Sequence, residues 1–360
     1  MTTTLEDCEK CRHIAGEQKR QFHSETKERL PKIVIIATGG TIIAKGVSPT
    51  ETTNYDIGAF GVEDVIGGIR SFWNGKAKIV TRTPFTLDST NLDLRYKICL
   101  YHEPMEAMAD EEIVGSLVLF RTDEMSATAN FEDTVIPDGP RKRIAFTGAT
   151  MLHTALSSDG RGNVVAAVNT LLDPSWTGVV MVMNDMITRP QETKKVRNRF
   201  EPGPGTYLGQ ITNFEPRLGH TERLNLPERI DISSLSHEDL EAGFPGAAIV
   251  PVTVDCNASQ WIAAIVSTGA KIIVIKAYST GWLLNDSREK IAKFASREDL
   301  VVVVTSRHGS ATVETTGVEG FISGGDWMLD QLLPILQLLV KLGYTKEGIR
   351  NKITAIWRPL

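Results

Sequence analysis

The sequence has few cysteines and no long apolar run, and each shortage excludes a class of protein. Four cysteines in 360 residues are too sparse for a disulfide-stapled scaffold, which a chain of this length does not need. No apolar run reaches the roughly 18 residues that would indicate a membrane helix. The N-terminal region also lacks the apolar core of a signal peptide. We therefore expect a cytoplasmic protein without a membrane partner.

An excess of basic residues is also missing. The formal net charge is −5, and no basic block follows the N-terminal region. A nucleic-acid partner requires a basic face that neutralises phosphates, so we expect none. Small anionic or zwitterionic substrates remain open, because the local charge of a cleft can oppose the net charge of the chain.

Residues 1–31 are strongly charged and show no hydrophobic period, which predicts a flexible N-terminal arm. Cys8 and Cys11, with His13 and His23 nearby, are residue types that bind zinc. A closed structural zinc site needs four ligands at well-defined spacing, however. We therefore expect Cys8 and Cys11 to be free thiols in a disordered tail, without a metal site.

Beyond the arm, short runs rich in Val and Ile alternate with helical patterns. Such runs are typical of strands buried on both faces. The alternation predicts a mostly parallel sheet flanked by helices. The expected strands are Lys32–Ala37, Lys78–Thr81, Ser116–Phe120, Arg143–Thr147 and Gly178–Met183, with helices around 91–109, 125–135 and 161–173.

The pattern dissolves between about 195 and 245, where Pro- and Gly-rich segments indicate loops. Alternation then resumes, with strands at Ala247–Val254, Lys271–Lys276 and Leu300–Thr305 and helices near 257–269, 286–296 and 327–342. We predict a two-domain α/β fold. Its parts are a larger N-terminal domain with the active site over 32–222, a linker over 223–245, and a smaller C-terminal α/β domain over 246–360.

The sharpest chemical signal is Thr38-Gly39-Gly40-Thr41, directly after the first expected strand. Two glycines allow a tight turn and bring backbone N–H groups close to a ligand. Thr41 then projects a hydroxyl from the carboxyl edge of the sheet, where ligands bind in open α/β folds. Three further polar clusters are expected near the same edge: Asn54-Tyr55-Asp56, Asp88-Ser89-Thr90 and Thr122-Asp123.

These motifs resemble those of the bacterial-type L-asparaginase family, which includes the glutaminase-asparaginases and shares one two-domain fold. The resemblance extends from about Lys32 to the C-terminal helix. It implies that Thr41 is the nucleophile and Tyr55 the lid tyrosine, and that Asp88 and Ser89 bind the substrate. It further implies catalytic roles for Thr122, Asp123 and Lys194, the last in Glu192-Thr193-Lys194. No metal or organic cofactor is implied.

The chemistry of these groups agrees with the implied roles. A neutral threonine hydroxyl is a weak nucleophile and needs a proton acceptor, which Tyr55 could provide by closing over Thr41. In a second cluster, the Asp123 carboxylate and the Lys194 ammonium would pair. Thr122 would then orient water or relay a proton. Backbone N–H groups near the glycine turn and at Thr122 could bind the developing oxyanion.

The sequence departs from the family in its specificity residues. The second signature, normally His-Gly-Thr-Asp-Thr, is Phe120-Arg121-Thr122-Asp123-Glu124 here. Arg121 could point into solvent, or enter the pocket and bind a carboxylate. Thr280 stands where a neighbouring subunit normally donates an asparagine. The donated glutamate is also doubtful, because that register gives Val313 with Glu314 adjacent.

Both donated residues normally hold the α-amino group of the substrate, so their loss predicts weak recognition of free asparagine. We expect an amidohydrolase that uses Thr41 on a larger or modified amide, assembled as a homodimer or homotetramer. The same groups could instead promote elimination, cyclisation or isomerisation of a metabolite. The sequence is also compatible with a non-catalytic binding homologue and with a plain asparaginase.

Overall fold

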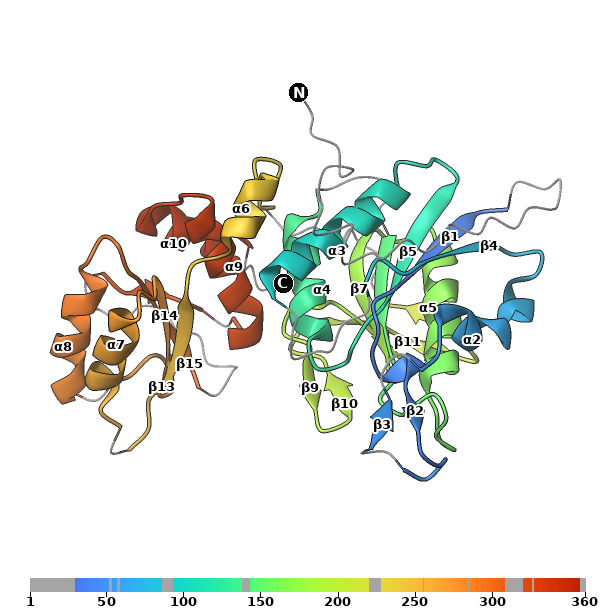
Figure 1. Ribbon diagram of the computed structural model, residues 1–360, viewed down its shortest axis with the longest axis horizontal. Helices are drawn as coiled ribbons and strands as arrows, with labels where there is room; N and C mark the ends of the chain where they lie inside the picture. The colour runs from blue at the N-terminus through green and yellow to red at the C-terminus, as the bar shows by residue number, and fades with distance from the viewer. Residues whose placement is uncertain are drawn as a thin grey trace. The chain divides into compact units, whose positions relative to one another are not determined.

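The chain forms two compact units, with the division after Asn225. The computed structural model describes residues 30–51, 54–56, 59–85, 93–137, 143–219, 228–254, 256–283, 285–307, 320–325 and 327–356. Within unit 1, up to Asn225, and unit 2, from Leu226, helices pack on parallel strands (Figure 1). The predicted fold class is therefore confirmed.

Unit 1 is built on a sheet whose described strands follow the order β12-β11-β8-β7-β6-β5-β1-β4. The strands from β4 to β7 run parallel, and the pairs from β7 to β12 are antiparallel. Parallel strands all end at one edge, so the turns that follow β1 and β5 are neighbours. The bounds are β1 (Lys32–Ala37), β4 (Lys78–Arg82), β5 (Ile113–Leu119), β6 (Arg143–Thr147), β7 (Gly178–Met183), β8 (Met186–Thr188), β11 (Tyr207–Thr212) and β12 (Glu215–Leu218).

Helices cover both faces of this sheet (Figure 1). Alternate residues of β1 show why its sequence is apolar throughout. Ile33 and Ile35 pack in one cluster with α2 (Val62–Gly67) and α5 (Gly160–Leu172). Val34 and Ile36 pack in another with α3 (Leu94–Ala107) and α4 (Met125–Val135). Because side chains alternate along a strand, burial on both faces requires an uninterrupted apolar run.

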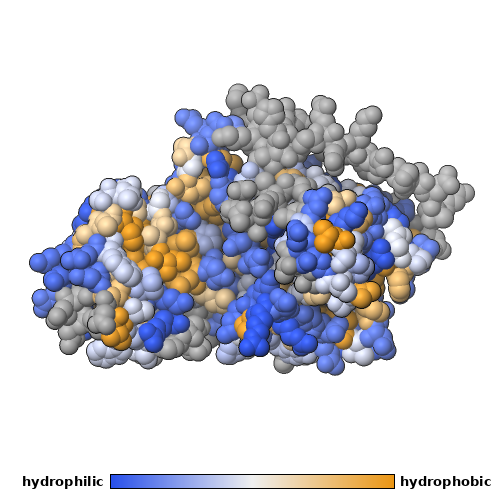
Figure 2. Space-filling view, turned by 60° about the horizontal axis from the view of Figure 1, so that its bottom comes forward, coloured by the Kyte–Doolittle hydropathy of each residue, from blue (hydrophilic) through white to orange (hydrophobic). Residues whose placement is uncertain are grey.

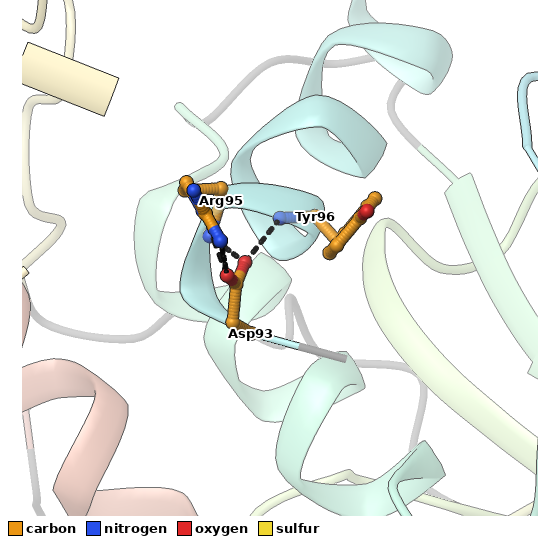
Figure 3. A network of polar contacts seen from close by, with 3 residues as sticks. All are labelled: Asp93, Arg95 and Tyr96. Atoms are coloured by element: carbon orange, nitrogen blue, oxygen red, sulfur yellow. Dashed lines mark hydrogen bonds and ion pairs between the residues drawn. The ribbon is translucent and has the colours of Figure 1, made fainter. Parts of the chain in front are cut away.

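The start of α3 is fixed by Asp93 (Figure 3). Its Oδ1 accepts hydrogen bonds from the backbone N–H groups of Arg95, at 2.9 Å, and Tyr96, at 3.4 Å. Its Oδ2 accepts a hydrogen bond from Arg95 Nε at 2.7 Å. The first N–H groups of a helix have no partner within the helix, so a carboxylate there satisfies them and opposes the positive end of the helix dipole.

Unit 2 contains a smaller sheet with all described neighbours parallel, in the order β13-β14-β15-β16. Ile262 of α7 and Ile291 of α8 share an apolar cluster with the strands. In Figure 1, α9 lies on the opposite side of the sheet from α7 and α8. The bounds are β13 (Ala247–Pro251), β14 (Ile272–Ala277), β15 (Val301–Ser306), β16 (Ile322–Ser323), α7 (Ala258–Ser267), α8 (Asn285–Ala295), α9 (Leu329–Lys341) and α10 (Lys346–Ile356).

The expectation that residues 195–245 lack regular structure is wrong in two places. The first part of this segment forms β11 and β12, which extend the sheet of unit 1, and the hairpin of β9 (Lys194–Val196) and β10 (Arg199–Glu201). In the expected linker, α6 (His237–Ala242) joins α9 of unit 2 through an ion pair between Asp239 and Lys341 at 3.4 Å. These elements are short and contain few Val or Ile residues, so the hydrophobic periodicity of the sequence does not reveal them.

Some expectations fall on residues that the structure does not describe. These are the arm up to residue 29 with Cys8 and Cys11, the substrate-binding candidates Asp88 and Ser89, and the pair Val313 and Glu314. Among the helices that are described, none has the length and apolar character needed to cross a membrane.

The cap on α3 yields a first prediction. Replacing Asp93 by alanine removes both backbone contacts and lowers the free energy of unfolding by about 1 kcal/mol, measured by urea denaturation. Asp93→Asn is the matched control, because an asparagine keeps the capping oxygen but loses the charge paired with Arg95. Equal loss in both variants would show that the ion pair, rather than the cap, stabilises the helix.

Candidate active site

The turn after β1 brings Thr41 to the carboxyl edge of the sheet. Gly39 and Gly40 have φ values of 109° and 100°, which non-glycine residues rarely adopt. The chain then enters a short 3₁₀ helix, η2 (Thr41–Ile43), with the side chain of Thr41 half-buried. Within the described part of the chain, no hydrogen bond to the Thr41 hydroxyl is found.

Thr38 joins this turn to the end of β5. Its backbone N–H and its hydroxyl both donate to the carbonyl oxygen of Leu119, at 3.2 Å and 3.0 Å. Leu119 is the last residue of β5, and the polar segment Arg121–Glu124 follows almost at once. The glycine turn and the second polar cluster are therefore held side by side.

Arg121 packs directly on the glycine turn. A Cβ atom on Gly40 would lie 3.0 Å from Arg121 Cγ and 3.2 Å from Arg121 Cα. The close approach and the positive φ both require glycine at position 40. Arg121 is only 7% exposed. Of the two orientations considered for it, the one into solvent does not occur.

Lys195 completes the second polar cluster. Its Nζ donates to Thr122 Oγ1 at 2.9 Å and to Asp123 Oδ1 at 2.7 Å. Thr122 is buried, whereas the side chain of Asp123 is 73% exposed. The hydroxyl, carboxylate and ammonium expected together are thus brought together, but the ammonium comes from Lys195 and not from Lys194.

The pleat of the β9–β10 hairpin explains this correction. Lys195 pairs with Phe200, which is buried in the core, while Lys194 pairs with Glu201 on the other face. Adjacent side chains of a strand point to opposite faces, so only one of the two lysines can reach Thr122. Lys194 is exposed, and Figure 2 shows a mostly hydrophilic surface in this lower part of unit 1. A strand of three residues is too short to reveal this register from sequence.

Tyr55 lies in β3 (Tyr55–Asp56), which pairs with β2 (Lys45–Gly46) just after Thr41. This hairpin and the β9–β10 hairpin both lie at the lower end of unit 1 in Figure 1. Tyr55 is 38% exposed, and no hydrogen bond joins it to Thr41 within the described segments. Thr280 is exposed in the turn between Tyr278 and Trp282 of unit 2, after β14.

Helix α4, which follows Asp123, is buried along its whole length despite its polar residues. Lys97 of α3 donates to Glu124 Oε2 at 3.1 Å and to Thr128 Oγ1 at 2.8 Å. Ser126 donates to the carbonyl oxygens of Pro190, at 3.3 Å, and Thr193. Sequence reasoning did not single out Lys97 or Ser126, because a lysine and a serine within helical patterns carry no local signal.

The arrangement offers the hydroxyl of Thr41 on a glycine turn, beside the buried hydroxyl of Thr122, which is held by a lysine–aspartate pair. Such a set can attack a carbonyl group and then orient water toward the product. No group of three or more His, Cys, Asp or Glu side chains suited to a metal ion occurs among the residues that are described.

Comparison with known proteins gives a consistent result. The family described as "Asparaginase, N-terminal" matches residues 32–219, more than half of the chain. The L-asparaginase 2-3 of Saccharomyces cerevisiae is 27% identical over 352 residues, covering 95% of each chain. The L-asparaginase 2 of Bacillus subtilis is 28% identical over 299 residues, covering 80% of this chain and 76% of its own.

A solved structure agrees at the level of the fold. The probable cytoplasmic L-asparaginase of Campylobacter jejuni superposes with a TM-score of 0.79 at 22% sequence identity, covering 90% of this chain and 99% of its own.

Buried Glu132 of α4 is a titratable group with an unusual setting. Neither carboxyl oxygen has a hydrogen-bond partner among the described side chains and backbone. Burial raises the pKa of Glu132 well above its ordinary range, and the nearby Lys97 ammonium only partly opposes this shift. The folded protein therefore keeps a proton on Glu132 at a pH where the unfolded chain has released it.

This difference predicts how stability depends on pH. Above the ordinary glutamate pKa, the folded state binds more protons than the unfolded state, so stability falls as the pH rises toward the raised pKa. Glu132→Gln removes the effect. Wild-type unfolding free energy should fall relative to this variant by up to about 1.4 kcal/mol per pH unit, measured by urea denaturation from pH 5.5 to 8. In the control Glu111→Gln, at an exposed glutamate, the free energy of unfolding should depend on pH as in the wild type. The same pH dependence in Glu132→Gln and the wild type would contradict the prediction.

Proposed function

The chain belongs to the asparaginase family of amidohydrolases, and from this we propose that it hydrolyses a side-chain amide with Thr41 as nucleophile. The observation that carries the proposal is the junction of the two polar turns. Thr38 binds the end of β5, and Arg121 packs on Gly40. The hydroxyl of Thr41 thereby shares one sheet edge with the cluster of Thr122, Asp123 and Lys195.

In the proposed reaction, Thr41 Oγ attacks the amide carbonyl carbon and gives up its proton. The carbon–nitrogen bond breaks, and the leaving nitrogen takes a proton and departs as ammonia. The acyl group remains as an ester on Thr41, and water then releases the acid and restores the hydroxyl. Tyr55 is the proposed proton acceptor for Thr41. Its present exposure is compatible with a lid that closes only over substrate.

The second cluster is proposed to handle water. Lys195 donates to both Asp123 and Thr122, so the orientation of the Thr122 hydroxyl is set by a charged neighbour. A hydroxyl fixed in this way can orient the attacking water or relay its proton. Backbone N–H groups at the glycine turn and at Thr122 are the proposed donors to the oxyanion.

We further propose that the substrate is not free L-asparagine. Arg121 stands where the family keeps a glycine, and it is buried against the turn that carries Thr41. A long cation so close to the nucleophile changes both the volume and the charge of the pocket. A site whose polar partners differ should discriminate strongly against the usual substrate. Larger or modified amides are the proposed substrates.

The proposal predicts a specific ranking of variants in ammonia release from L-asparagine, L-glutamine, D-asparagine and asparaginyl dipeptides. Thr41→Ala should reduce release by about 10³-fold or more, because it removes the nucleophile. Lys195→Met should reduce it by about 10²-fold. The matched control, Lys194→Met, changes a neighbouring exposed lysine and should retain activity within about twofold.

Four results would count against parts of this proposal. Release that depends equally on Lys194 and Lys195 would refute the assignment of the lysine. Rapid, Thr41-dependent release from L-asparagine would mean that the substrate is the usual one. A product of unchanged mass, without ammonia, would replace hydrolysis by elimination, cyclisation or isomerisation, and binding without turnover that survives Thr41→Ala would indicate a binding protein.

We also propose that the protein assembles as a homodimer or homotetramer, with Thr280 of one subunit near the site of another. Thr280 is exposed in a turn of unit 2 and therefore accessible to a partner. Sedimentation at micromolar concentration should show a species larger than a monomer. Thr280→Ala should alter the KM of the amide substrate more than its kcat, and a purely monomeric protein with full activity would exclude the proposal.

A further inference from the structure

The first turn of α4 is anchored to α3 by a buried cation. Lys97 Nζ contacts Glu124 Oε2 at 3.1 Å and Thr128 Oγ1 at 2.8 Å, with a side chain only 6% exposed. Glu124 directly follows Asp123 and is the N-cap residue of α4. One ammonium group therefore connects two successive turns of backbone immediately after the Thr122-Asp123 pair.

A second anchor joins the same helical turn to the strand that carries Lys195. The Ser126 hydroxyl lies near the carbonyl oxygens of Pro190, at 3.3 Å, and Thr193. Thr193 is fully buried, and its own hydroxyl donates to the carbonyl oxygen of Arg189 at 2.5 Å. Lys195 stands only two residues beyond Thr193, so Ser126 limits how far β9 can move from α4.

Stability alone gives a poor explanation of Lys97. The N-terminus of a helix carries a positive partial charge, which disfavours a cation there. Burial of an ammonium group adds a desolvation cost, and an ion pair often only offsets that cost. An apolar side chain would pack between α3 and α4 without either penalty. Besides its electrostatic effect on Glu132, the ammonium adds a fixed position for Glu124 and Thr128.

We propose that Lys97 and Ser126 are positioning residues that set the distance between the Thr122-Asp123 turn and Lys195. Lys97 holds the turn from the side of α3, and Ser126 holds it from the side of β9. Neither touches the reacting groups, and both act through α4. The catalytic part of this inference rests on the proposed amide hydrolysis, whereas its geometric part does not.

The geometric part is tested without turnover, by acetylation of lysines with acetic anhydride and site-resolved mass spectrometry. In the wild type, Lys195 is paired with Asp123 and should react more slowly than exposed Lys194, its neighbour on the same strand and an internal control. Lys97→Met and Ser126→Ala should each raise the Lys195 to Lys194 labelling ratio by at least about threefold, as expected for a weakened charge-assisted hydrogen bond.

Two variants serve as matched controls. Thr134→Val removes another buried hydroxyl of α4, one that donates only to the carbonyl oxygen of Asn130. It should leave the labelling ratio unchanged. Lys97→Arg keeps the charge and the donors, and it should restore most of the protection lost in Lys97→Met. Thermal unfolding identifies the variants that remain folded.

The kinetic test uses ammonia release from the same amides. Lys97→Met and Ser126→Ala should lower kcat by about 10- to 100-fold with KM nearly unchanged, because the misplaced groups act on the reaction rather than on binding. Unchanged labelling in both folded variants would overturn the inference, and so would an equal rise in Thr134→Val. If the wild type releases no ammonia but the labelling ratio still rises in both variants, the proposed hydrolysis is refuted and the positioning role is supported.

Discussion

The two hydrogen bonds from Thr38 to the carbonyl oxygen of Leu119 join the ends of β1 and β5, and the rest of the site depends on this junction. They are possible because the two strands are parallel neighbours with their carboxyl ends in register. The absence of a side chain at Gly40 then lets Arg121 pack directly on the turn. A segment that starts at residue 38 and another that starts at residue 120 thus become one surface.

Polar side chains are buried in different amounts in the central strands of unit 1 and in helix α4. Its central strands bury uninterrupted apolar side chains, which supply the hydrophobic stabilisation of the sheet. Helix α4 instead buries serine, threonine, asparagine and acidic residues on every side. Buried polar groups cost free energy unless they are paired, and their pairing fixes geometry more strictly than apolar contact does. The chain concentrates this cost in the helix that directly follows Thr122 and Asp123.

Sequence alone predicted the parts of the fold that long apolar runs encode. The strands Lys32–Ala37, Arg143–Thr147 and Gly178–Met183 and the helix 125–135 have the expected bounds. The hairpins between 194 and 218 were missed, because strands of three to six residues with mixed composition give little periodicity.

The candidate site shows a similar limit. The motifs placed Thr41, Thr122 and Asp123 on one edge, because strand order and direction follow from the α/β pattern. The choice between Lys194 and Lys195 depended on the pleat of a three-residue strand. Sequence similarity pointed to Lys194, whereas Lys195 contacts Thr122 and Asp123. Partners that lie far apart in sequence, such as Lys97 and Glu124, have no local pattern and are evident only in the structure.

The two adjacent lysines at the start of β9, Lys194 and Lys195, have an evolutionary consequence. Inserting or deleting one residue in a loop before a strand exchanges its inward and outward faces, which normally destroys a site built on that strand. Here an inserted residue would move Lys194 into the position of Lys195 and keep an ammonium group at Thr122, whereas a deleted residue would place Val196 there. The loop from Arg189 to Thr193 can therefore lengthen by one residue during divergence without loss of the cation. Two identical adjacent residues thus allow the loop before a strand to gain a residue while the strand still presents the same chemical group to the site.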